Sequence, residues 1–168
     1  TVTAKIALLK KSYALGKLLS IEQESPFRMV PECPVYEHCG GCQLSHLTYE
    51  GQLDMKYRRV KDVIERIAGE SGDLVKPVLP AAHLFAYRNK MAVPAGLVKR
   101  KAALGCYRQG SHDIIPVSSC AIQKEENNRL LQFARWFIEK YGISVYDEKT
   151  RKGSLRRVMG RVGDDGKV

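Results

Sequence analysis

The spacing of apolar residues along the chain predicts two helices. Between residues 49 and 68, such residues recur at intervals of three and four. They are Leu53, Tyr57, Val60, Ile64 and Ile67. Gly69 follows as the predicted C-cap. A second helix is predicted over residues 124–141, before Gly142. We expect this helix to bury four large side chains: Leu130, Phe133, Phe137 and Tyr141.

Shorter apolar runs bounded by turn residues predict strands. Two are expected at residues 2–9 and 12–23, with four of their side chains facing inward: Ile6, Leu8, Leu18 and Ile21. Three or four more are expected between residues 87 and 117, followed by one last strand. Their predicted ranges are 88–94, 102–107, 113–117 and 154–162. Helices mixed with antiparallel strands indicate an α+β fold.

The segment from residue 25 to 47 has no regular period, and it contains three of the five cysteines, Cys33, Cys39 and Cys42. A loop of this length needs something other than apolar packing to order it, and a bound metal would supply that order. Three thiolates need a fourth ligand. Cys106, Cys120 and His46 are the candidates. Thiolates of this kind hold zinc or an iron–sulfur cluster, and the spacing leaves both open.

The charge of the chain points to a polyanionic partner. Over 168 residues the formal net charge is +10, and Lys and Arg side chains neutralise phosphates. No segment approaches the roughly 20 apolar residues of a membrane span, and none is typical of a signal peptide. The cysteine pattern suits a metal site better than secreted disulfides, so we expect a cytoplasmic protein.

Candidate RNA contacts lie in a stretch from His83 to His112 that contains no acidic residue. They are Arg88, Asn89, Lys90, Lys99, Arg100, Lys101, Arg108 and His112. An arginine fork, an amide and a point charge together can hold phosphate and read an unstacked base. In the alternative interpretation, Arg88 and Asn89 brace the cysteine loop, and His112 makes only a local hydrogen bond.

Several motifs together resemble RumA-like methyltransferases, which form 5-methyluridine in 23S ribosomal RNA. The motifs are Cys33-Pro34-Val35-Tyr36, Cys39-Gly40-Gly41-Cys42-Gln43, Tyr87-Arg88-Asn89-Lys90, Gly105-Cys106-Tyr107 and Cys120-Ala121-Ile122-Gln123. The resemblance covers nearly the whole chain. It implies a [4Fe-4S] cluster held by Cys33, Cys39, Cys42 and Cys120, with Cys106 as a spare thiol that has a structural role.

The same resemblance implies three parts. Residues 1–30 would be the last strands of an OB-like TRAM barrel, residues 31–80 the iron–sulfur loop and its helix, and residues 81–168 a central RNA-binding domain. Thr1 and the turn-like residues near Val168 suggest a piece of a longer protein. The S-adenosylmethionine site and the catalytic residues would lie beyond this piece, so no residue here is assigned as catalytic.

The expected partner is ribosomal RNA, with no membrane association, and the expected state is a monomer. An alternative reading is a stand-alone RNA-binding module stabilised by zinc. A third, a redox sensor using Cys39 and Cys42, is weaker because such a pair belongs at a strand-to-helix junction of a βαβ unit.

Overall fold

The computed structural model describes all residues from Thr1 to Val168. The chain divides into two compact units. The first unit contains Thr1–Val30 and His46–Val78, and the second contains Pro31–Ser45 and Leu79–Val168. The loop that carries Cys33, Cys39 and Cys42 therefore belongs to the second unit, together with the central sheet.

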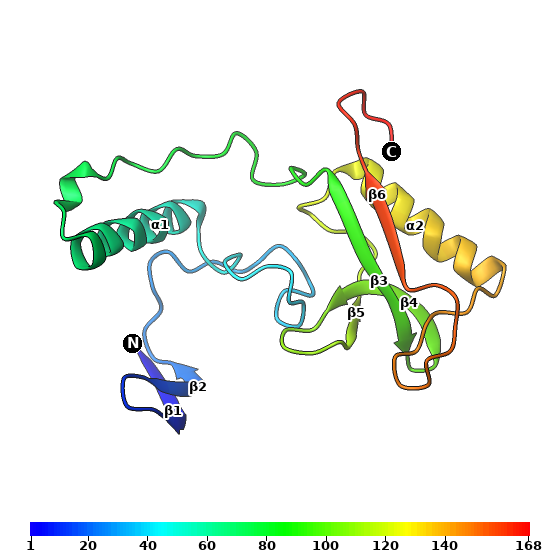
Figure 1. Ribbon diagram of the computed structural model, residues 1–168, viewed down its shortest axis with the longest axis horizontal. Helices are drawn as coiled ribbons and strands as arrows, with labels where there is room; N and C mark the ends of the chain where they lie inside the picture. Colours follow the sequence, from blue (N-terminus) through cyan, green and yellow to red (C-terminus); the bar gives the residue numbers. More distant parts are fainter. The chain divides into compact units, whose positions relative to one another are not determined.

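The first unit begins with an antiparallel hairpin of β1 (Val2–Leu9) and β2 (Ala14–Ile21) (Figure 1). Both strands occur where the sequence predicted them. The prediction that Ile6, Leu8 and Leu18 face inward is wrong in this structure, because these side chains are exposed. A two-stranded ribbon has no second layer that could bury them.

The predicted helix of the first unit is confirmed. Thr48 caps α1 (Tyr49–Val63), and its hydroxyl accepts a hydrogen bond from the backbone N–H of Gly51 at 3.2 Å. A π-helical turn, Ile64–Ala68, continues α1. It ends at Gly69, whose φ of 72° is left-handed, as the predicted C-cap requires.

The second unit is built on a four-stranded antiparallel sheet in the order β5-β4-β3-β6. The strands are β3 (Lys90–Val98), β4 (Lys101–Tyr107), β5 (Ile114–Pro116) and β6 (Arg157–Arg161). The helix α2 (Glu125–Lys140) packs against this sheet (Figure 1). The α+β class with antiparallel strands is therefore confirmed.

Strand β3 is longer than predicted because it changes partner at Pro94. From Lys90 to Pro94 it pairs with β6, and from Ala95 to Val98 it pairs with β4. Proline has no N–H to donate, and it lies at the last β6 pair, just before pairing with β4 begins. A strand that would otherwise end at Pro94 can therefore continue to the β3–β4 turn.

The core of the second unit lies between the sheet and α2. Its buried members are Met91, Val93, Ala95, Leu104, Val117, Leu131, Ile138 and Val145. The prediction that α2 buries Phe133, Phe137 and Tyr141 is wrong. These three rings are between 41% and 56% exposed, while Asn127 and Leu131 are almost completely buried.

Helix α2 has two apolar stripes, and the stripe with the smaller side chains packs against the sheet. Asn127 explains this choice, because its amide group donates to the backbone carbonyl oxygen of Asn89 at 3.0 Å. Gly160 on β6 lies against the same side chain, and a Cβ there would come within 2.9 Å of the Asn127 side-chain oxygen. The buried face is therefore fixed by close approach and hydrogen bonding, and the aromatic rings remain on the outer face.

Candidate cysteine-lined cavity and basic surface

The cysteine loop is attached to the end of β4 through its backbone. Cys39 forms an isolated antiparallel bridge with Arg108, and the N–H of Gly40 donates to the carbonyl oxygen of Tyr107 at 2.9 Å. A Cβ on Gly40 would lie 3.0 Å from that same oxygen, so the approach requires glycine. Within the loop, the Tyr36 hydroxyl donates to the carbonyl oxygen of Gln43 at 2.9 Å.

Cys120 reaches the same region from the segment between β5 and α2. The backbone N–H of Cys120 donates to the side-chain oxygen of Asn128 at 2.9 Å. The Asn128 amide group donates in return to the Cys120 carbonyl oxygen at 3.4 Å. Asn128 is buried in the first turn of α2, so the helix fixes the position of Cys120. Nothing in the sequence motifs identified this role of Asn128.

All five cysteines line one cavity of about 450 Å³ in the second unit, and all are free thiols. Three come from the loop and two from distant segments, at Cys106 and Cys120. His46, the imidazole candidate for a fourth ligand, is not among the lining residues. The structure thus brings together the four cysteines of the predicted ligand set, with Cys106 beside them.

The thiols are close enough to affect each other's ionisation. Burial and the neighbouring Cys39 raise the pKa of Cys106 to about 12. Burial also raises the pKa of Cys42, and the nearby Cys120 adds to this effect. These thiols therefore keep their protons unless a cation compensates the charge of the thiolates. A cation bound here would displace protons from the sulfurs.

The cavity is lined by thiols, which are the donors that iron–sulfur clusters use, and it has room for more than a single ion. Its volume is about fifteen times the roughly 30 Å³ that one water molecule occupies in the liquid. Soft thiols surround this space, and thiolates are the ligands of iron–sulfur clusters. A single zinc ion would need its ligands about 2.3 Å from one point. The structure contains no group of three or more His, Cys, Asp or Glu side chains that could hold one metal ion.

Arg88, Asn89 and Lys90 line the same cavity. Their backbone is part of the scaffold: the Arg88 N–H donates to the carbonyl oxygen of Ile122 at 2.9 Å, and the Asn89 carbonyl oxygen accepts from Val162 at 2.9 Å. All three residues are nevertheless exposed. These hydrogen bonds join the segment before α2 and the residue after β6, and not the cysteine loop, so the bracing interpretation stays a prediction. The side chains lie at the surface.

The remaining basic candidates lie at two places. Arg108 follows β4 directly beside the cysteine loop, whereas Lys99, Arg100 and Lys101 lie at the turn between β3 and β4. Nine residues of extended chain separate Lys90 from Lys99, which corresponds to about 30 Å. None of the basic side chains in these two groups takes part in an ion pair. Their charges are available to an external anion.

The β3–β4 turn has an unusual backbone for its sequence. Lys99 and Arg100 have φ values of 51° and 66°, and the flanking Val98 and Lys101 are paired across the ladder. Two-residue hairpins with positive φ at both central positions favour Asn-Gly, because side chains with a bulky Cβ are strained there. This turn therefore has two cationic residues at positions where glycine would make the turn more stable.

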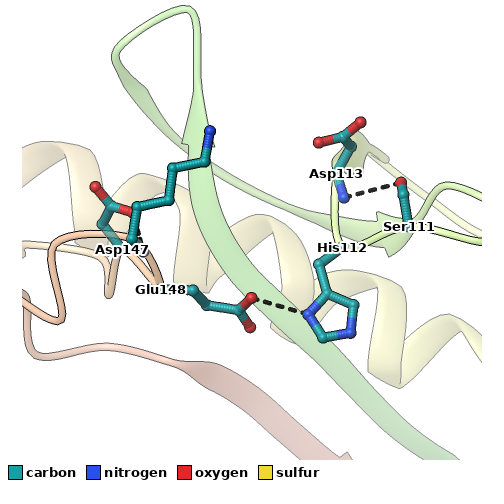
Figure 2. Close-up of polar contacts among 6 residues, drawn as sticks. Ser111, His112, Asp113, Asp147 and Glu148 are labelled. Carbon is teal, nitrogen blue, oxygen red and sulfur yellow. Dashed lines mark hydrogen bonds and ion pairs between the residues drawn. The ribbon is translucent and has the colours of Figure 1, made fainter.

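His112 is held by a residue far along the chain. Its Nδ1 lies 2.8 Å from a carboxylate oxygen of Glu148, and Figure 2 shows the two side chains facing each other. The imidazole also stacks on Tyr107, with ring centroids 4.8 Å apart. The partner is thus not the local one expected in the alternative interpretation. Nothing in the sequence pointed to Glu148.

Comparison with known proteins identifies the relatives of this chain. It is 52% identical to an uncharacterised RNA methyltransferase of Bacillus cereus over 159 residues, which is 95% of this chain and 35% of the relative. Uncharacterised RNA methyltransferases of Clostridium tetani and Listeria innocua are each 42% identical over the same shares. Over nearly its whole length, the chain is similar to these RNA methyltransferases. It spans about a third of the length of these relatives. No protein-family model matches the chain.

A solved structure shares the fold of this chain. The tRNA (uracil-54, C5)-methyltransferase of Pyrococcus abyssi, crystallised with S-adenosyl-L-homocysteine, superimposes with a TM-score of 0.65 at 25% identity. The match covers 96% of this chain and 35% of the Pyrococcus protein. No helix of the structure has the length and apolar character needed to cross a membrane.

Proposed function

We propose that this chain is the RNA-recognition part of an S-adenosylmethionine-dependent methyltransferase that forms 5-methyluridine in 23S ribosomal RNA, and that it carries a [4Fe-4S] cluster. The observation that carries this proposal is the cavity at which thiols from separate segments meet. Cys33, Cys39 and Cys42 come from one loop, and Cys120 is held by α2. A bound group would account for five thiols that gather around one cavity.

The cluster, when bound, would supply a covalent link between the loop and the segment before α2. The four proposed ligands are Cys33, Cys39, Cys42 and Cys120. Asn128 positions Cys120, and Gly40 allows the loop to approach Tyr107. Metal binding of this kind contributes directly to folding. We therefore assign the cluster a structural role.

Unpaired basic side chains support an RNA partner. Those of Arg88, Lys90 and Arg108 lie at or beside the cavity. A cluster that orders this loop would also fix the position of these cations, and phosphate contacts need fixed donors to set the register of the RNA. We further propose that the β1–β2 hairpin is the end of a TRAM barrel, whose other strands would cover its exposed apolar side chains.

Transfer RNA is the competing substrate, because the Pyrococcus protein named above acts on tRNA. We favour ribosomal RNA because the cysteine set resembles that of the 23S enzymes. The full-length protein should be incubated with methyl-labelled S-adenosylmethionine and either 23S rRNA or tRNA transcripts, and the RNA then digested to nucleosides.

Labelled 5-methyluridine in 23S rRNA alone is the expected result. Product in tRNA alone would overturn the ribosomal assignment, and product in neither RNA would overturn the methyltransferase proposal. Residues 1–168 alone serve as the control and should give no product, since no residue here is assigned as catalytic.

A stand-alone, zinc-stabilised RNA-binding module is the alternative function. The basic surface alone would suit it equally well. It predicts stoichiometric zinc without sulfide and full RNA affinity in residues 1–168 alone. The resemblance of the cysteine set to that of the 23S enzymes favours the cluster.

A further inference from the structure

Cys106 is a fifth thiol at a site whose proposed cluster uses four. Strand β4 places it there, and it is half-buried. Cys39 and Arg108 lie opposite each other in a bridge, so their side chains point to the same face. Side chains alternate along a strand, so the residue two positions before Arg108 also points to that face. That residue is Cys106, and it lines the same cavity as Cys39.

We propose that Cys39 and Cys106 form a reversible disulfide when the cavity holds no cluster, so that this pair is a redox modification site. The inference rests on the proposed iron–sulfur function, because Cys39 would bind the cluster when it is present and would pair with Cys106 only when it is absent. The pairing itself follows from the bridge between Cys39 and Arg108, which places Cys39 beside the end of β4, and from the cavity that both cysteines line. A disulfide would keep the emptied loop attached to β4 and protect Cys39 from further oxidation.

The geometry favours this pair over the other thiol pairs. Among the other thiols, Cys120 has the largest electrostatic effect on Cys42, and Cys42 also interacts with Ser45. Cys39 is instead held against the end of β4 by two backbone contacts, the bridge to Arg108 and the hydrogen bond from Gly40 to Tyr107. A disulfide requires Cβ atoms about 4 Å apart. Strand β4 is held between β3 and β5, so any adjustment toward this distance falls on the loop.

The chemistry needs an oxidant, and a small-molecule disulfide such as oxidised glutathione is sufficient. The Cys39 thiolate attacks one sulfur of the reagent, forms a mixed disulfide and releases one thiol. The Cys106 sulfur then attacks the Cys39 sulfur, the bond between Cys39 and the reagent breaks, and the Cys106 proton passes to the departing sulfur, which leaves as the second thiol. In total, two protein thiols become one disulfide, and the two electrons and two protons end on the two released thiols.

Peptide mapping of the full-length protein tests this pairing directly. Trypsin releases Cys106 in the peptide 102–108, which contains no other cysteine, whereas Cys39 lies in the peptide 29–56 together with Cys33 and Cys42. Protein purified aerobically and stripped of iron should be treated with oxidised glutathione, digested without reductant and analysed by mass spectrometry. The expected product is a cross-link between these two peptides, and dithiothreitol should remove it.

Variants assign the cross-link to one pair. Cys39→Ser and Cys106→Ser should each abolish it, whereas Cys33→Ser and Cys42→Ser should retain it. Protein carrying an intact cluster should form about tenfold less, because the cluster occupies Cys39. Cys106→Ala serves as a second variant, and circular dichroism of each variant confirms folding.

A cross-link that persists in folded Cys39→Ser, or oxidised protein without the 102–108 cross-link, would overturn the proposal. Iron and sulfide analysis of the same preparation reports on the cluster separately. The disulfide can therefore fail while the cluster is found, and the reverse is equally visible.

Discussion

Replacing Lys99 with Asn and Arg100 with Gly should stabilise the β3–β4 turn and weaken RNA binding. Both residues have left-handed backbone angles, at 51° and 66°. A residue with a Cβ pays about 1–2 kcal/mol in this region relative to glycine. Glycine loses about 0.5–1 kcal/mol through the greater freedom of the unfolded chain. We therefore expect a net gain of about 1 kcal/mol, which is about a fivefold change in the opening equilibrium.

Amide hydrogen exchange in the full-length protein measures this gain, since the amides of β3 and β4 should exchange about fivefold more slowly. The RNA effect is measured with a ribosomal RNA transcript at several salt concentrations. Each lost phosphate contact lowers the slope of log affinity against log salt by about 0.7 for single-stranded RNA. Loss of both Lys99 and Arg100 contacts should reduce it by about 1.4.

A second double variant, Lys99→Gln with Arg100→Gln, separates charge from backbone strain. It removes both cations but keeps a Cβ at each position, so RNA binding should weaken without a gain in stability. Unchanged affinity and unchanged salt slope in this variant would refute the assignment of the turn as an RNA contact. The strain at Lys99 and Arg100 would then have no functional explanation.

Three further predictions concern the second unit. Gly105→Ala should destabilise the protein by at least about 2 kcal/mol in urea denaturation, because the new Cβ would lie 1.9 Å from the carbonyl oxygen of Ile115 and push β5 from β4. Asn128→Ala removes two hydrogen bonds to the Cys120 backbone and should cost about 2 kcal/mol in thermal unfolding, with lower iron retention in metal analysis. The N–H of Lys149 lowers the pKa of Asp147 below its ordinary value of 3.8. The Asp147 carboxylate therefore stabilises the folded protein above about pH 4, and this stabilisation is lost as the pH falls through the lowered pKa of Asp147. In Asp147→Asn, the urea midpoint should show less acid dependence between about pH 6 and pH 2.

Local patterns predicted the helices and strands well because their signals lie within a few residues. Helical spacing and Gly69 located the first helix and its end, and Gly142 correctly marked the limit of α2. Where tertiary contacts decide the outcome, prediction failed. The stripe of α2 with the largest apolar residues was expected to be buried, but Asn127 needs to reach the backbone of Asn89, and this selects the other face.

The candidate site was predictable as a set of residues but not as an arrangement. Cysteine spacing and family resemblance identified Cys33, Cys39, Cys42 and Cys120, and the structure places them around one cavity. The contact between Cys39 and Cys106 depends on a bridge between a loop and a strand that are far apart in sequence. No local pattern reports such a bridge.

The basic residues could likewise be predicted from the sequence, but their arrangement in space could not. A run without acidic residues predicted eight RNA contacts as a single group, yet β3 separates Lys90 from the turn at Lys99. Charge composition does not report the direction of a strand. The contact between His112 and Glu148 could not be predicted either, since 36 residues separate the partners.

The central claim is that Cys33, Cys39, Cys42 and Cys120 hold a [4Fe-4S] cluster. The most direct measurement is iron, acid-labile sulfide and zinc content of the full-length protein prepared without oxygen, compared with Cys120→Ala and Cys106→Ala. We predict four iron and four sulfide per chain in the unmodified protein and in Cys106→Ala, and loss of both in Cys120→Ala. Stoichiometric zinc without sulfide, or a cluster lost equally in both variants, would contradict the account.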